Sequence, residues 1–269
     1  MIDINNLCFS YQKQDRLFNE LSLKEESGQV IGLLGKNGAG KTTLLQLLTG
    51  LLTPTSGQIT FNGQSPTKRS PKFMEQICFV PEEFVMPQIK MATFVNGNSP
   101  FYPRFDRTLF NDLITQFKLD DKKALSKMSH GQKKKFRIAF ALATKCQLIV
   151  LDEPTNGLDI PSKVIFRQMV AGALEEDQTV IISTHQVKDV ETLIDKIILV
   201  DEGQVTFNKS IIEISERYEF KIVSQLPEHT LFSELNPMGY KIIVPANGLS
   251  SEVDIELLFN AINNGVKFN

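Results

Sequence analysis

The chain has no tryptophan and only three cysteines among its 269 residues. Cys8, Cys78 and Cys146 lie far apart, and each falls within an apolar run. An odd number of isolated cysteines argues against a disulfide framework, and their spacing matches no metal or redox motif. We therefore expect buried, reduced thiols.

Long apolar runs and a strong overall charge are also missing. No run approaches the roughly 18 residues that a membrane-spanning helix needs. Residues 1–4 show neither a basic start nor the apolar core of a signal peptide, which predicts a cytosolic protein. The formal net charge is −2, so no overall field attracts nucleic acid, and we expect no nucleic-acid partner.

A glycine-rich loop is the strongest feature that the chain does contain. Residues 30–34 are typical of a buried strand, and residues 35–42 match the spacing G-x-x-x-x-G-K-[ST]. Such a loop turns backbone N–H groups and a helix N-terminus toward phosphate, and its Lys and Thr suit the β- and γ-phosphates and Mg²⁺. The predicted phosphate-binding residues are Gly35, Asn37, Gly38, Ala39, Gly40, Lys41, Thr42 and Thr43, with Thr42 as a Mg²⁺ ligand.

Buried strands and helices alternate through much of the chain. Apolar runs at residues 148–151, 179–183 and 197–200 predict strands, and helices are expected from the glycine loop to about Leu52 and after Pro161. Repeated strand–helix units imply a parallel sheet with helices on its faces.

Two further regions accompany this predicted core. Short alternating runs before residue 30 and at residues 58–61, with a turn at Asn62-Gly63, predict an N-terminal antiparallel β subdomain. Residues of about 82–143 predict an inserted helical subdomain, whose last helix begins at Ser129.

The tail, residues 212–269, is predicted to be a small α+β extension to a domain of residues 1–211. Residues 218–224 and 240–244 suggest strands. Residues 251–260 suggest a helix with Ser251 and Asp254 at capping-box spacing, and Val253, Leu257 and Leu258 are expected on its buried face. The predicted fold class is therefore α/β, a parallel-sheet core with the antiparallel subdomain, the helical subdomain and this extension.

A second phosphate-handling element follows the predicted strand 148–151. Asp152 and Glu153 stand at the carboxyl end of that strand, where parallel sheets bind ligands. Asp152 can hold Mg²⁺ directly or through water. Glu153 points in a different direction and can orient or deprotonate an attacking water.

With both elements in view, the chain resembles the nucleotide-binding subunit of ABC transporters over about residues 1–210, with a P-loop NTPase core. The resemblance implies that ATP and Mg²⁺ are the cofactors and that Glu153 is the catalytic carboxylate. It further implies that His185 contacts the γ-phosphate and that Asp159 belongs to the D-loop. Tyr11 falls where the family stacks an aromatic ring on adenine, and Phe9 is the fallback.

The family signature LSGGQ reads Met-Ser-His-Gly-Gln at residues 128–132. In the family this segment binds the γ-phosphate of an ATP held by the other subunit of a dimer. The resemblance thus assigns Ser129, Gly131 and Gln132 to the nucleotide of a partner, while His130 replaces a glycine. For the three lysines at residues 133–135 we expect a solvated helix face, with electrostatic support for the phosphate as the alternative.

Glu82 takes the position of the glutamine in the family's Q-loop. A carboxylate can still hold water or Mg²⁺, so Glu82 is predicted both to contact the nucleotide site and to act as a metal ligand. The family's Q-loop couples the nucleotide to the membrane partner. Docking of that partner is expected near Glu82 and on the helical subdomain. Phe101 and Tyr102 are candidates for exposed contacts there, and packing beneath the subdomain is the alternative for each.

The resemblance implies an ATPase that powers transport through a separate membrane permease. Two copies, or one copy and a paralogous subunit, would enclose two ATP molecules. The subunit would sit on the inner face of the cell membrane through its permease, and the tail tilts the resemblance toward export. Two other readings remain, a soluble ABC-type ATPase in cofactor assembly and a binding module without catalysis.

Overall fold

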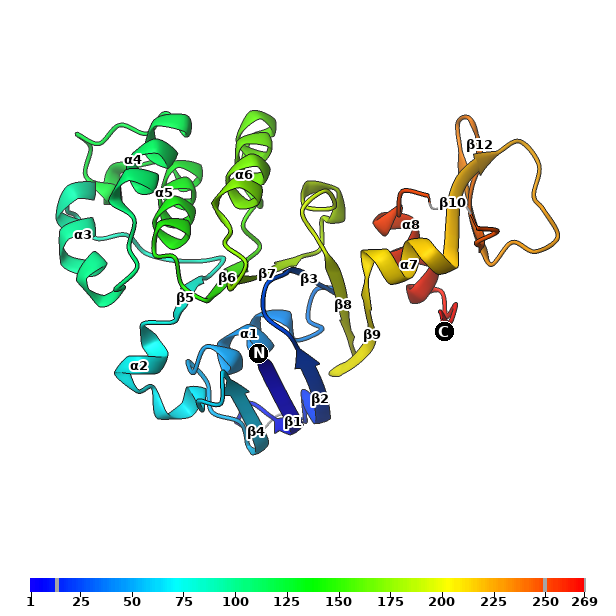
Figure 1. Cartoon of the computed structure of the whole chain (residues 1–269), viewed down its shortest axis with the longest axis horizontal. Helices are drawn as coiled ribbons and strands as arrows, with labels where there is room; N and C mark the ends of the chain where they lie inside the picture. The colour runs from blue at the N-terminus through cyan, green and yellow to red at the C-terminus, as the bar shows by residue number, and fades with distance from the viewer. Residues whose placement is uncertain (13–14, 249–250, 269) are drawn as a thin grey trace.

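The computed structural model describes residues 1–12, 15–248 and 251–268 of the chain. Figure 1 shows an α/β core with an antiparallel sheet below it, a group of helices beside it and a C-terminal unit projecting from the other side. This arrangement confirms the predicted fold class.

The central sheet has the strand order β5-β6-β7-β3-β8-β9 within the described residues. Its first five strands pair in parallel, and β9 adds an antiparallel edge. The predicted strands of the core are therefore confirmed. The bounds are β3 (Val30–Leu34), β5 (Ile77–Val80), β6 (Leu148–Asp152), β7 (Thr179–Thr184), β8 (Lys196–Asp201) and β9 (Gln204–Ser210).

Helices cover both faces of this sheet, as its apolar strands require. Ile31 and Leu33 of β3 belong to one buried cluster, which α1 (Lys41–Leu48) shares. Val30 and Leu34, on the opposite face, belong to the other cluster, together with α5 (His130–Ala143) and α6 (Ile160–Ala173). Each fully buried side chain of this size contributes about 1.5–3 kcal/mol of hydrophobic free energy.

Helix α1 is shorter than predicted, since it ends at Leu48 rather than near Leu52. Gly50 has a φ of +72°, and a Cβ there would lie 2.3 Å from the carbonyl oxygen of Pro66. The amides of Gly50 and Leu51 donate to the carbonyls of Leu47 and Gln46, which closes the helix in a glycine-dependent turn.

The N-terminal antiparallel sheet has the order β2-β1-β4. Its strands are β1 (Ile2–Phe9), β2 (Phe18–Glu25) and β4 (Ser56–Phe61), and the short helix α2 (Pro71–Met74) follows. Asn62 and Gly63 have φ values of +49° and +73°, so the predicted turn is present.

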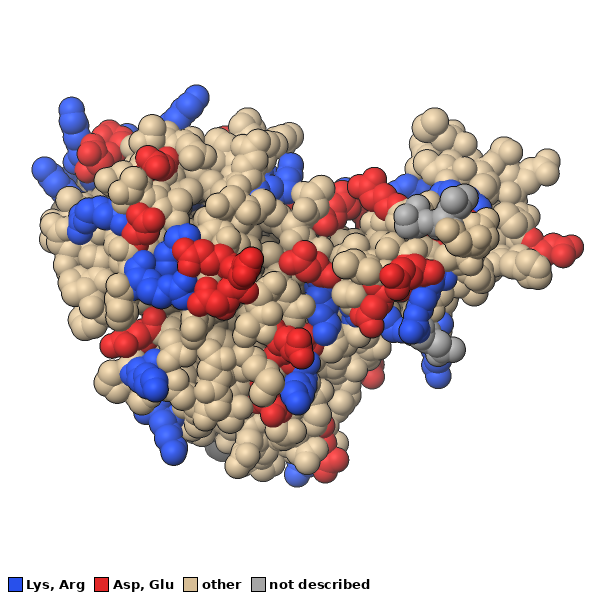
Figure 2. All heavy atoms as spheres, viewed as in Figure 1, with Lys and Arg blue, Asp and Glu red and all other residues tan. Residues whose placement is uncertain are grey.

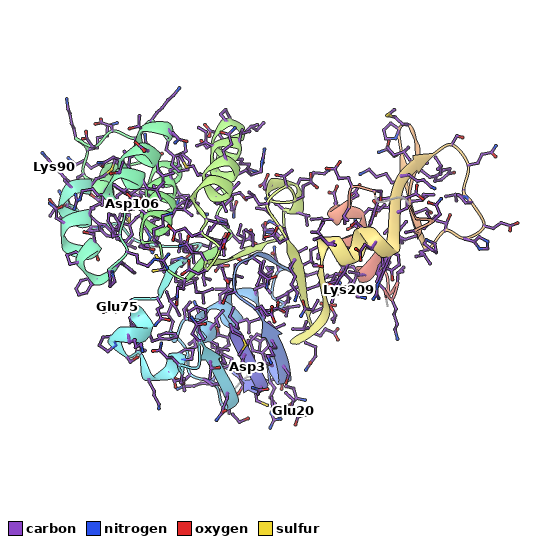
Figure 3. The ribbon with its side chains drawn as sticks, in the orientation of Figure 1. Asp3, Glu20, Glu75, Lys90, Asp106 and Lys209 are labelled. Carbon is purple, nitrogen blue, oxygen red and sulfur yellow. The ribbon has the colours of Figure 1, made fainter. Side chains whose placement is uncertain are left out.

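The helical subdomain contains α3 (Met91–Asn98), α4 (Arg107–Gln116) and α5. Figure 3 labels Lys90 and Asp106 here, and Asp106 caps α4 by accepting a hydrogen bond from the backbone N–H of Leu109.

The two aromatic candidates of this subdomain differ in exposure. Phe101 is 69% exposed, as expected of a contact residue. Tyr102 is half-buried and packs edge-on against Phe140 of α5. An exposed Tyr102 is therefore the wrong expectation, and the alternative of packing within the subdomain holds for this residue.

The C-terminal unit departs most from prediction. Helix α7 (Ile211–Arg217) leads into a sheet of order β10-β12-β11, and the sequence patterns predict neither α7 nor β11. The last helix, α8, spans Ile255–Asn263 instead of residues 251–260. The strands are β10 (Tyr218–Val223), β11 (Phe232–Asn236) and β12 (Gly239–Pro245).

The predicted capping box at the start of α8 is also wrong. Asp254 caps the helix through the backbone N–H of Leu257. The Ser251 hydroxyl instead accepts from the backbone N–H of Phe220, and Val253 precedes the helix. A donor on a distant strand competes for Ser251, and spacing along the chain cannot reveal it. Leu257 and Leu258 are buried as predicted, and the division between residues 211 and 212 stays a prediction.

The described part of the chain contains no helix that is both long and apolar enough to cross a lipid bilayer. Cys8, Cys78 and Cys146 are buried and unpaired, as predicted. Figure 2 shows acidic and basic side chains mixed over the visible face, without a continuous field of one sign.

Candidate functional site

The glycine loop joins β3 to α1 and forms one wall of a cavity. Gly40, the residue before α1, has a φ of +100°, and a Cβ there would lie 2.9 Å from the Phe18 ring. Glycine is therefore required at this position for both conformation and space.

The cavity beside this loop has a volume of about 690 Å³, within the range of small-molecule sites. We call it the loop cavity. Nine of the residues predicted for the site line it, whereas Gly35 and Ala39 support the loop without lining it. The lining residues are Tyr11, Asp15, Arg16, Leu17, Asn37, Gly38, Gly40, Lys41, Thr42, Thr43, Glu82 and Glu153.

Lys41 lies buried at the start of α1. Its ammonium donates hydrogen bonds to the carbonyl oxygens of Gly35 at 2.7 Å and Lys36 at 3.1 Å. Burial lowers the pKa of Lys41, while the charges of Glu153 and Asp152 oppose that shift. A bound polyphosphate would supply the negative charge that favours the ammonium form.

Asp152 ends β6, is 1% exposed and does not itself line the loop cavity. Its Oδ1 accepts a hydrogen bond from the Ser183 hydroxyl. Its Oδ2 is buried, and among the described residues it has no partner. A buried carboxylate oxygen left unpaired fits a metal ion or an ordered water, and the exposed Thr42 hydroxyl on the cavity wall is a second oxygen donor.

Glu153 follows with a φ of +45°, a left-handed conformation that side chains other than glycine rarely adopt. Its backbone N–H donates hydrogen bonds to both the carbonyl oxygen and the hydroxyl oxygen of Ser183, each at 3.1 Å. Its carboxylate lies 2.8 Å from Nδ1 of His185. The structure thus brings together the two residues predicted for catalysis, with the carboxylate at the wall of the loop cavity.

Glu82 lies in the segment after β5 and also lines the loop cavity. Its Oε1 accepts a hydrogen bond from the side-chain amide of Asn156 at 2.8 Å. The contact connects the predicted Q-loop position to the turn that follows Glu153.

Tyr11 stands at the rim of the loop cavity and is 41% exposed. Its hydroxyl shares a 2.9 Å hydrogen bond with the Thr43 hydroxyl. Phe9 packs edge-on against Tyr11 but is only 6% exposed, so the fallback residue belongs to the core. A base entering the cavity would therefore meet the ring of Tyr11.

The signature segment lies outside the loop cavity. Ser129 caps α5 and forms a capping box with Gln132. Next to it, a Cβ on Gly131 would lie 3.2 Å from the carbonyl oxygen of Gly157, so the start of α5 touches the loop after β6. Asp159 caps α6 and lies 3.8 Å from the Lys135 ammonium. The loop cavity of the same chain is not lined by any of the four residues predicted for the partner's nucleotide or the D-loop, which are Ser129, Gly131, Gln132 and Asp159.

The lysine run at residues 133–135 corrects another expectation. Lys134 is completely buried, and its ammonium donates to the carbonyl oxygens of Glu153 and Asn156. The prediction of a solvated face is therefore wrong for Lys134, because the turn after β6 offers carbonyl partners inside the protein.

Several site residues escape prediction from the sequence. Asp15, Arg16 and Leu17 line the loop cavity from the segment before β2, which carries no motif. Ser183 and Asn156 lie within recognised segments, but their partners are distant in sequence. Only the three-dimensional pairing of β6 with β7 brings Ser183 to Asp152.

Comparison with known proteins agrees with this geometry. Residues 18–156 match the family model described as ABC transporter. The chain belongs to the ABC transporter family. Its ABC relatives are ATP-binding proteins, so this chain is an ATP-binding subunit whose ATPase activity powers transport.

Two curated ABC relatives illustrate the similarity. The ABC transporter ATP-binding protein YtrB of Bacillus subtilis (strain 168) is 30% identical over 206 residues, 76% of this chain and 70% of that protein. The lantibiotic transport ATP-binding protein SrtF of Streptococcus pyogenes is 32% identical over 215 residues, 78% of this chain and 90% of that protein.

Solved ABC structures share the fold. An ATP-binding subunit of an ABC transporter aligns with a TM-score of 0.72 and 21% identity over 79% of this chain and 91% of its own. The cassette MJ0796, in a dimeric post-hydrolysis state with ADP and Pi, gives a TM-score of 0.69 and 21% identity over 78% of this chain and 98% of its own.

Proposed function

We propose that this ABC subunit hydrolyses ATP with Mg²⁺ at a site shared between two chains. The main support is that the predicted site residues lie in two separate places on one chain. The loop cavity holds Lys41, Thr42 and the carboxylate of the Glu153–His185 pair, whereas Ser129 and the start of α5 lie outside it.

Within one chain, the loop cavity is proposed to bind ATP. Backbone amides of residues 37–43 and the N-terminus of α1 face the phosphates, and Lys41 neutralises the β- and γ-phosphates. Tyr11 stacks on the adenine ring. The unpaired Asp152 oxygen and the Thr42 hydroxyl would hold Mg²⁺, and Glu82, which lines the cavity with Thr42, would be a further ligand. The ion would neutralise charge on the phosphates.

Chemistry at the γ-phosphate is proposed to fall to Glu153 and His185. The carboxylate orients the attacking water and accepts its proton. His185, hydrogen-bonded to that carboxylate at 2.8 Å, fixes the carboxylate's direction and contacts the γ-phosphate. Most of the rate enhancement in such phosphoryl transfers comes from positioning and charge stabilisation.

The second chain is proposed to contribute Ser129, Gly131 and Gln132. The capping box occupies the N–H groups of Ser129 and Gln132 at the start of this 14-residue helix. The other N–H groups of the first turn and the positive helix end would face a γ-phosphate brought by a partner. Asp159 lies 3.8 Å from the ammonium of Lys135 in the same helix, which supports its proposed place near the contact between the two chains. A second copy or a paralogous subunit would fill this role.

Transport is proposed to occur through a separate membrane permease, which would hold this subunit at the inner face of the membrane. Exposed Phe101 and the segment near Glu82 are the proposed contacts. Among the relatives, one is named for lantibiotic transport and another for molybdate import, so similarity alone does not give the direction of transport.

Hydrolysis by the purified full-length chain tests this proposal. We expect release of phosphate from ATP that stops when EDTA removes Mg²⁺. Asp152→Asn should lower the rate by about tenfold or more, because it removes a metal-binding charge. The matched control is Asp112→Asn, which makes the same change at an exposed position of α4 and should keep the wild-type rate. Hydrolysis that continues in EDTA would contradict the proposed metal requirement.

A further inference from the structure

A fully buried lysine stands in the second turn of α5, outside the loop cavity. Lys134 has 0% exposure, whereas Lys133 and Lys135 beside it are half-buried. Lysine is rarely buried without partners, because removing an ammonium from water is costly. Its position therefore requires specific partners within the protein.

The partners of Lys134 are the two ends of one turn. Its Nζ donates to the carbonyl oxygen of Glu153 at 2.7 Å and to that of Asn156 at 2.9 Å. The N–H of Asn156 also donates to the Glu153 carbonyl at 3.3 Å. The ammonium thus closes the turn after β6 from the side of α5.

The turn of residues 153–156 contains a strained residue that hydrogen bonds must hold in place. Glu153 holds a φ of +45°, which costs free energy for a residue with a side chain. Two bonds to Ser183 fix its N–H, and Lys134 fixes its carbonyl. With both ends of its backbone held, the Glu153 side chain leaves the turn in one direction, toward His185.

Charge supports the same arrangement. Burial lowers the pKa of Lys134, and the carboxylates of Glu82, Glu153 and Asp152 oppose that shift. Asn156 connects Lys134 with Glu82, since its carbonyl accepts from the lysine and its amide donates to the carboxylate. In the described part of the chain, Lys134 and Lys41 are the two buried cations near these three carboxylates.

We propose that Lys134 is a positioning residue for ATP hydrolysis, which holds the turn of residues 153–156 so that the Glu153 carboxylate faces the attacking water. The inference rests on the proposed function, because it gives Glu153 the catalytic role. Lys134 does not line the loop cavity, so it would act through Glu153. It also fixes Glu153 to the helix that Ser129 begins, so one helix connects both half-sites of a chain.

Steady-state ATP hydrolysis by the full-length chain tests the role. Lys134→Met keeps the length of the side chain and removes its hydrogen-bond donors. We expect kcat to fall by about tenfold or more, the range of a misplaced catalytic group, while the Kd for ATP changes by less than about threefold. The matched control, Lys122→Met, removes an exposed lysine and should leave both constants unchanged.

A double-mutant cycle separates positioning from a general loss of structure. In a chain that already carries Glu153→Gln, Lys134→Met should lower the residual rate by less than about twofold, because the group it positions is gone. Additive losses in the two variants would overturn the inference. Equal kcat in Lys134→Met and wild type would also overturn it.

Folding and the proposed function are tested separately. If Lys134→Met does not fold, Lys134→Gln, whose shorter and neutral side chain retains an N–H donor group, should show a smaller but measurable loss of kcat at an unchanged Kd. A parallel fall in ATP binding would assign Lys134 to folding or binding instead and overturn the inference. A wild-type chain without Mg²⁺-dependent hydrolysis would overturn the proposed function itself, whereas an active wild type with an unaffected variant overturns only the role of Lys134.

Discussion

Single residues at the end of β6 decide the chemistry that this fold can perform. Asp152 and Glu153 are adjacent in sequence but have different surroundings. Asp152 stays in the strand with one oxygen unpaired, and Glu153 turns into a left-handed conformation toward His185. These different surroundings suit the proposed roles, in which Asp152 would hold a metal ion and Glu153 would orient a water.

Lys41 is predicted to be necessary for tight binding of ATP. Lys41→Ala should weaken ATP binding by about a hundredfold or more, because the site loses its main cation for the β- and γ-phosphates. Equilibrium binding of a fluorescent ATP analogue measures the effect. Lys36→Ala, at an exposed position of the same loop, is the control. Undiminished binding by Lys41→Ala would contradict the assignment of the loop.

The buried thiol of Cys78 is predicted to make the stability of the chain depend on pH. Burial raises the pKa of the Cys78 thiol to about 11, so the folded chain holds this proton more tightly than the unfolded chain. The contribution of this thiol to the free energy of unfolding is fully present below the ordinary thiol pKa and is lost as pH rises toward 11. The pH dependence of unfolding between about 8.5 and 11 should therefore be weaker in Cys78→Ala than in wild type. An identical slope in both proteins would contradict the assigned burial.

The candidate site is predictable from sequence wherever a local motif carries the chemistry. Gly40, Lys41 and Thr42 form such a motif, because one loop and one helix start position them all. Lys134 is not predictable in this way, since its partners lie in the turn after another element. Its neighbours in sequence are partly solvated, so the run gives no sign that the middle residue points inward.

At the scale of helices and strands, sequence predicts an element better than its ends. The parallel strands are recognisable because burial on both faces leaves continuous apolar runs. Helix α1 ends early because Gly50 adopts a left-handed conformation. Strand β11 escapes prediction, since Leu235 is 81% exposed and the strand lacks a clear alternation of buried residues.

Helix α8 gives a prediction about its cap. Asp254→Ala should lower the free energy of unfolding by about 1 kcal/mol, because the backbone N–H of Leu257 loses its acceptor. The variant also loses the 2.6 Å contact with Lys241. Chemical denaturation measures the change, with the exposed Glu252→Ala as the control. A stability loss in Glu252→Ala as large as that in Asp254→Ala would contradict the assigned cap.

For the whole molecule, the structure separates two sets of residues that the proposed reaction would bring together from two chains. The loop cavity is lined by the glycine loop and the start of α1. Helix α5 belongs instead to the group of helices beside the core (Figure 1). Under the proposed function, hydrolysis would require association of two chains, and loss of the γ-phosphate contacts would let them separate. ATP binding and its hydrolysis would then set the state that a permease senses.

In the proposed function, ATP joins two chains at shared sites. The most direct measurement is the mass of the Glu153→Gln chain in solution with Mg²⁺ and ATP, by light scattering after size exclusion. Slow hydrolysis should hold the ATP-bound state, so we predict a dimer with ATP and a monomer with ADP. Adding Ser129→Arg to the same chain should leave ATP bound but abolish the dimer. A monomer of the Glu153→Gln chain with ATP demonstrably bound would contradict a site shared between two chains.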